Sequence, residues 1–110
     1  MKRFADIICV PPDKIQEYTK VHDEIWPHIE ELMRNANIKN FTIFYRDGYL
    51  FKYYEYCGTD YEKDMKSLDM DEEHQRWIAY TKQFQIPVDT AESGEWWSPM
   101  QEVYHLDEGE

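Results

Sequence analysis

The stretch IKNFTIFYRDGYLFKYYEY, residues 38–56, decides the fold of this chain. Residues 38–45 and 50–56 are rich in aromatic and β-branched side chains, which is typical of strands. Between them lies the dipeptide Asp47-Gly48, a strong signal for a tight hairpin turn. We therefore predict two antiparallel strands joined by this turn.

The segment before the hairpin predicts a strand and two helices. Residues 4–10 are apolar and β-branched and predict a strand, which Pro11-Pro12 ends. Asp13 is a suitable N-cap for the helix that follows. Pro27 suits the first turn of a second helix and disfavours helical geometry in the residue before it, so the two helices meet there. The apolar stripe of the second helix consists of Ile29, Leu32, Met33 and Ala36.

The segment after the hairpin predicts further helices and a last strand. The helical region begins at residues 58–60 and carries two stripes, one on each side of the acidic run 69–73. These stripes are Tyr61, Met65 and Leu68, then His74, Trp77, Ile78 and Thr81. Residues 85–94 predict a loop, residues 97–106 the last strand, and residues 107–110 an acidic tail in solvent.

The order of these elements predicts the fold class. Strand, helices, two strands, helices, strand is the split βαβ, or ferredoxin-like, arrangement. We expect residues 1–110 to form one α+β domain, an antiparallel sheet with helices on one face. The other face needs a cover, and a second copy of the chain is the obvious one. The sequence thus predicts a homodimer of the dimeric α/β-barrel type, whose facing sheets enclose a barrel-like cavity.

Composition and charge exclude several classes of ligand. The 12 Lys and Arg residues and 23 Asp and Glu residues give a net charge of −11, which would repel nucleic acids and anionic membranes. No segment is long enough to span a membrane. Cys9 and Cys57 lie in apolar stretches without metal-ligand spacing, so we expect reduced, half-buried thiols in a cytoplasmic protein. A neutral small molecule is the expected ligand.

The aromatic fraction of 16% admits two explanations. Aromatic residues could pack at sheet edges or in a dimer interface, or they could form the walls of a cavity that stacks against sugar rings. Composition alone favours packing.

His22 is the most informative candidate for catalysis, because a histidine can give and take a proton near neutral pH. On the predicted helix face, Tyr18 lies one turn before it and Trp26 one turn after it. The positions that share this face are Ile15, Tyr18, His22 and Ile25. A site wall and a core stripe have the same spacing, so spacing does not decide between them.

The remaining candidates carry weaker signals. We expect His28 and His74 at the surface, His74 among charged partners, while His105 could face either side of the last strand. No histidine pair has metal-ligand spacing, so no metal site is expected. Glu55 and Glu102 lie in aromatic-rich strands, where a glutamate either points to solvent or is buried as an acceptor or base.

Three segments resemble the L-rhamnose mutarotase family. They are EYTKVHDEIWP at 17–27, QRW at 75–77 and QEVYHL at 101–106, so the resemblance spans nearly the whole chain. It implies a ferredoxin-like homodimer without metal or cofactor that interconverts the α and β anomers of a 6-deoxyhexose. It also implies that His22 is the proton donor and that Tyr18 and Trp77 contact the sugar.

Two positions depart from the family pattern. Phe41 stands where a tyrosine is expected and Ile78 where a second tryptophan is expected, whereas Trp96-Trp97 could restore an aromatic wall. L-fucose is therefore the rival substrate to L-rhamnose. The substrate-binding positions we expect are Tyr18, Trp26, Phe41, Trp77, Ile78 and Glu102.

Mutarotation needs an acid and a base but no redox chemistry. His22 would donate to the ring oxygen, and the complementary base is unassigned, with a carboxylate or a bound water as candidates. Two other classes share the fold: a cofactorless monooxygenase for an aromatic ligand, and a sugar-binding module without activity.

Overall fold

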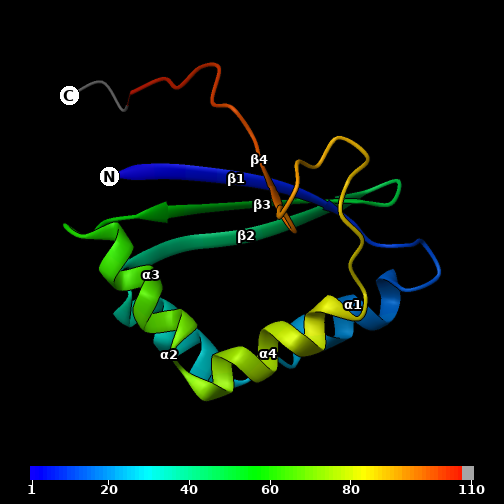
Figure 1. Ribbon diagram of the computed structural model, residues 1–110, viewed down its shortest axis with the longest axis horizontal. Helices are drawn as coiled ribbons and strands as arrows, with labels where there is room; N and C mark the ends of the chain where they lie inside the picture. Colours follow the sequence, from blue (N-terminus) through cyan, green and yellow to red (C-terminus); the bar gives the residue numbers. More distant parts are fainter. Residues whose placement is uncertain (108–110) are drawn as a thin grey trace.

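The computed structural model describes residues 1–107 and has an α+β fold with four helices and four strands. The elements are β1 (Lys2–Cys9), α1 (Ile15–Asp23), α2 (Pro27–Asn35), β2 (Ile38–Arg46), β3 (Tyr49–Tyr56), α3 (Tyr61–Asp69), α4 (Glu72–Lys82) and β4 (Ser98–Pro99). The sheet is antiparallel with the order β2-β3-β1-β4, and the helices lie on one of its sides (Figure 1). This confirms the predicted ferredoxin-like class. Of the predicted acidic tail, residues 108–110 lie outside the described residues.

The predicted hairpin is present and its turn has the expected geometry. Asp47 and Gly48 have φ angles of 50° and 90°, and two positive φ values are what a type I′ turn requires. Phe44 of β2 lies opposite Phe51 of β3, and Phe51 lies opposite Ile7 of β1. Directly opposite residues share a face, so this row and the residues that alternate with it define the two sides of the sheet.

Two hydrophobic clusters hold the helices against the sheet. One consists of Ile8, Val10, Tyr18, Leu50 and Phe84, and the other of Ala36, Ile38 and Leu68. Members of both clusters, Tyr18 and Ile38 among them, also line a common cavity. The two clusters therefore pack the layer between the helices and the sheet at two places, and residues of both clusters border a cavity in this layer.

The first helix is shorter than the apolar spacing predicted. Its N-cap is Lys14 rather than Asp13, and it ends at Asp23. Trp26 is the N-cap of α2 with an extended backbone, as expected for a residue that precedes proline. Trp26 therefore does not continue the helix face that carries Tyr18 and His22.

The last strand is present but much shorter than the predicted range 97–106. Only Ser98 and Pro99 pair with β1, and one further hydrogen bond joins the Met100 N–H to the Ala5 carbonyl oxygen at 2.8 Å. Pro99 has no N–H to donate to a ladder, which weakens pairing at this point. Beyond it the chain runs along the side of the sheet away from the helices (Figure 1), and Val103 is 91% exposed.

Candidate active site

A cavity lies between the helices and the sheet. Its outer part is an open groove of about 860 Å³ bordered by α1, α2 and the edge strand β2. Its inner part is a pocket of about 210 Å³ that reaches β3, α3 and α4. Tyr18 and His22 line both parts, so they lie where the groove meets the inner pocket.

His22 is held in one orientation by its own helix. Its Nδ1 lies 3.0 Å from the carbonyl oxygen of Tyr18, which can only accept a hydrogen bond. In the neutral ring Nδ1 therefore carries the hydrogen, and Nε2 has the free lone pair. Burial lowers the pKa of His22 from its ordinary 6.5, while the Tyr18 carbonyl and Asp23 act in the opposite direction. His22 is thus neutral at pH 7, with Nε2 able to accept a proton.

Tyr18 belongs to a chain of side-chain hydrogen bonds. Trp96 Nε1 donates to Gln85 Oε1 at 2.7 Å, and Gln85 Nε2 donates to the Tyr18 hydroxyl at 3.0 Å. Burial raises the pKa of Tyr18, which keeps the hydroxyl protonated, although the bond from Gln85 opposes this effect. Since its oxygen already accepts from Gln85, the hydroxyl has its hydrogen to offer to a ligand.

Aromatic residues form the walls of the cavity. Trp77 is buried and meets the His22 ring edge-on, with centroids 5.3 Å apart. Trp97 lines the inner pocket, and Phe41 lines both parts, stacked at 6.0 Å on Tyr54. Ile78 also lines the inner pocket. The structure therefore brings together five of the residues predicted for the site: Tyr18, His22, Phe41, Trp77 and Ile78.

The structure does not bring Trp26 to the cavity. Its ring packs against Trp77 at 5.2 Å and stacks on Tyr80 at 6.3 Å, and with Tyr80 it lines a separate hollow at the surface. This follows from the early end of α1. Trp26 supports Trp77 from behind instead of facing a ligand.

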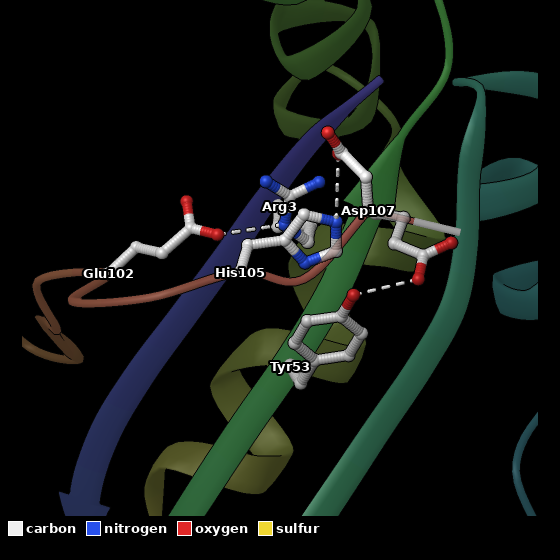
Figure 2. Close-up of polar contacts among 6 residues, drawn as sticks. Arg3, Tyr53, Glu102, His105 and Asp107 are labelled. Carbon is white, nitrogen blue, oxygen red and sulfur yellow. Dashed lines mark hydrogen bonds and ion pairs between the residues drawn. The ribbon is translucent and has the colours of Figure 1, made fainter. Parts of the chain in front are cut away.

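Glu102 lies on the opposite face of the sheet from His22. It accepts a hydrogen bond from Arg3 Nε at 2.9 Å, above the face that also carries Tyr53 (Figure 2). Because the chain leaves β1 after Met100, Glu102 is carried to this side.

Glu55 does not serve as a buried base either. It accepts from the Tyr53 hydroxyl at 2.7 Å and from Asn40 Nδ2 at 2.8 Å, and these bonds lower its pKa.

His28 lies at the surface as predicted, whereas the expectation for His74 was wrong. His28 is paired with Asp71 at 3.1 Å. His74 is half-buried and lines the inner pocket, and within residues 1–107 its Nδ1 has no hydrogen-bond partner. It is turned inward because it shares a helix face with Trp77. Cys9 and Cys57 are both free, but Cys57 is exposed rather than half-buried.

Residues 1–107 contain no group of three or more His, Cys, Asp or Glu side chains arranged to hold a metal ion. In the same part of the chain, each helix is too short or too polar to cross a membrane.

Comparison with known proteins identifies the family. The sequence profile of the L-rhamnose mutarotase family matches residues 3–106. The chain belongs to this family. A UPF0734 protein of Dictyostelium discoideum is 33% identical over 114 residues, covering 96% of this chain and 90% of that protein. The L-rhamnose mutarotase of Oceanobacillus iheyensis is 34% identical over 111 residues, covering 97% of this chain and 100% of that one.

A solved structure agrees with the family assignment. The L-rhamnose mutarotase of Formosa agariphila superposes with a TM-score of 0.75 at 19% identity, covering 97% of this chain and 100% of that chain. At this identity the likeness establishes a common fold. Membership of the mutarotase family confirms the prediction of an isomerase that acts on carbohydrates.

The cavity also contains polar residues that were not predicted from the sequence. Lys52 and Tyr54 line the inner pocket from β3, and Asp6 of β1 lies opposite Lys52. The signal was present, because strand alternation places Leu50, Lys52 and Tyr54 on one face. The number of charged residues elsewhere on the chain made Lys52 inconspicuous.

Proposed function

We propose that this protein interconverts the α and β anomers of L-rhamnose in the cavity at His22. The observation that carries this proposal is the position of His22. A neutral imidazole, oriented by the Tyr18 carbonyl, lies at the junction of groove and pocket against Trp77. Membership of the L-rhamnose mutarotase family supports the choice of reaction.

His22 acts first as a base in this proposal. From the sequence we expected it to donate to the ring oxygen, but in the neutral ring its Nδ1 hydrogen is engaged by a carbonyl and Nε2 can only accept. Nε2 takes the proton of the anomeric hydroxyl, the ring opens to the aldehyde, and the bond between the first two carbons rotates. Nε2 returns the proton when the ring closes on the other face. General acid–base catalysis of this kind contributes roughly 10²–10⁴-fold in rate.

The cavity suits a neutral sugar with one apolar edge. Tyr18 offers a hydrogen to a sugar hydroxyl, and aromatic walls accept C–H faces and a deoxy methyl group. L-fucose is the second candidate, because Phe41 lacks the hydroxyl that a tyrosine would present. Sugar preference is tested by measuring anomer exchange with NMR saturation transfer across L-rhamnose, L-fucose and their non-deoxy relatives. Exchange of L-rhamnose no faster than in buffer would contradict the proposal, and binding without faster exchange would indicate a sugar-binding module.

We infer that two copies cover each other's helix-free face. Ile7, Phe51 and Phe44 form an apolar row across this face, and Phe44 is 61% exposed. The apolar side chains of the C-terminal segment, Val103, Tyr104 and Leu106, are also exposed. Burial of such a surface favours association.

We also infer a cytoplasmic location, supported by two free cysteines, which is tested by cell fractionation.

A further inference from the structure

Lys52 is a cation on the floor of the inner pocket. It lies at a helix-facing position of β3 between Leu50 and Tyr54, both of which contribute packing rather than charge. Its side chain is only 18% exposed. A buried cation is costly unless it is paired, so its surroundings indicate what it does.

The contacts of Lys52 are looser than those of a structural ion pair. Its Nζ lies 3.5 Å from Asp6 Oδ2, 4.4 Å from the centroid of the Trp97 ring and 5.9 Å from that of Tyr54. Among the carboxylates of residues 1–107, that of Asp6 alone lies within 4.0 Å of the Lys52 Nζ. An ammonium has three N–H donors, so one carboxylate at this distance leaves hydrogens for a ligand. Asp6 also balances the charge, which keeps the pocket suited to a neutral sugar.

Mutarotation requires a second proton-transfer group, because the ring oxygen must be protonated as the anomeric hydroxyl loses its proton. His22 cannot fill both roles in one step when only Nε2 is free. Lys52 and His22 line the same inner pocket, Lys52 from the sheet and His22 from α1. A sugar between them has a base on one side and an acid on the other.

We propose that Lys52 is the general acid that protonates the ring oxygen while His22 takes the anomeric proton. This inference rests on the proposed mutarotase function. The electron pair of the anomeric O–H bond forms the carbonyl, and the bond between the anomeric carbon and the ring oxygen breaks. That oxygen then takes a proton from the Lys52 ammonium. Ring closure reverses each transfer and restores the imidazole and the ammonium, so no other reactant is consumed.

The proposal requires a bell-shaped pH dependence. The base must be neutral, so exchange is lost as pH falls through the pKa of His22. The acid must be protonated, so exchange is lost as pH rises through the pKa of Lys52. Burial lowers the pKa of Lys52 from its ordinary 10.5, opposed by Asp6, so the alkaline limb lies below that value. The titratable groups that face Lys52 or share its pocket are Asp6, Tyr18, His22, Tyr54, Asp69 and His74.

The test compares Lys52→Met and Lys52→Arg with a matched control. Lys82→Met removes another lysine that stacks on a tryptophan, 5.2 Å from the Trp96 ring, but outside the cavity. We expect Lys52→Met to slow L-rhamnose exchange by about 10²-fold and to remove the alkaline limb, and Lys82→Met to behave as wild type. Lys52→Arg keeps the charge but cannot release a proton near neutral pH, so it should also lose the limb. The double variant Asp6→Asn/Lys52→Met, which leaves no unpaired carboxylate, should remain slow.

A second measurement does not depend on turnover. With lysine labelled at Cε, the NMR signal missing from Lys52→Met identifies Lys52, and we expect L-rhamnose to shift it. An active wild type with a Lys52→Met variant of equal rate and unchanged pH profile would overturn the role of Lys52 and leave the mutarotase function standing. A wild type that accelerates exchange of no sugar would overturn both.

Discussion

The indole Nε1 of Trp96 donates a hydrogen bond to Gln85 Oε1 at 2.7 Å, and this contact determines how Tyr18 meets a ligand. An indole N–H can only donate, so it fixes which end of the Gln85 amide faces it. The other end then donates to the Tyr18 hydroxyl at 3.0 Å. Trp96, 78 positions after Tyr18 in the chain, thus orients the Gln85 amide, and Tyr18 keeps its hydroxyl hydrogen free for the sugar.

Trp96→Phe should therefore weaken sugar binding, although residue 96 does not contact the sugar itself. Loss of the indole N–H lets the Gln85 amide rotate and accept from Tyr18, which removes the donor that the sugar uses. We expect KM to rise severalfold, and the free energy of unfolding to fall by about 0.5–1.5 kcal/mol for the lost hydrogen bond. Exchange kinetics and urea unfolding measure the two effects. In a Tyr18→Phe background the same substitution should no longer change KM, and additive effects would contradict the coupling.

Substitution of His22 should abolish exchange while the fold survives. His22→Ala removes the base but leaves both hydrophobic clusters intact, because His22 belongs to neither of them. We expect L-rhamnose exchange to fall to within about 10-fold of the uncatalysed rate, a loss in the range that general acid–base catalysis supplies. Circular dichroism checks the fold. A folded variant that exchanges anomers at the wild-type rate would show that another residue transfers the proton.

Stability should decrease as the pH falls below 6.5, the ordinary pKa of histidine. Burial lowers the pKa of both His22 and His74. Below pH 6.5 the unfolded chain therefore binds more protons than the folded chain does. The stabilisation that the neutral, buried rings give to the fold is fully present above pH 6.5. It is lost as the pH falls from that value to the folded-state pKa. His74→Gln should reduce this dependence, measured as the urea midpoint between pH 7 and pH 5.5. An unchanged slope would mean that His74 titrates normally.

The sequence predicted the fold from local signals, and it predicted the site from helix spacing together with the resemblance to the family. Asp47-Gly48 and the strands around it required no knowledge of the rest of the chain, and Tyr18, His22 and Trp77 did lie around one cavity. The prediction that Trp26 lines the site was wrong, because α1 ends at Asp23 and the helical spacing behind the prediction does not continue to Trp26.

The other failures had a different origin. The path of the segment that carries Glu102 depends on tertiary contacts, which spacing does not encode. Lys52 was missed although strand alternation places it on one face with Leu50 and Tyr54, because the many charged residues of the chain made one lysine inconspicuous.

A charge on the helix-free face should separate the proposed dimer. Phe44 lies opposite Phe51 on that face and is 61% exposed, so Phe44→Glu would bury a carboxylate in an apolar contact. We expect wild type to sediment as a dimer at micromolar concentration and the variant as a monomer. Met70→Glu changes a residue that is 69% exposed beyond α3, and it should leave the dimer intact. A monomeric wild type would contradict the inference.

Phe41→Tyr should change which sugar the enzyme prefers. Phe41 lines both the groove and the inner pocket, is 38% exposed and stacks on Tyr54, so a hydroxyl added to its ring would extend toward the cavity or its mouth. A site that hydrogen-bonds a sugar hydroxyl discriminates against sugars that lack it in that position, because the partner is then left unpaired. We therefore expect the ratio of L-rhamnose to L-fucose exchange rates to change by about 10-fold, which corresponds to one hydrogen bond of roughly 1.4 kcal/mol, while catalysis persists. Saturation-transfer rates for both sugars and their non-deoxy relatives, in wild type and variant, measure the ratio. Equal ratios across the panel would mean that position 41 does not face the sugar, and that Phe41 acts only through its packing on Tyr54.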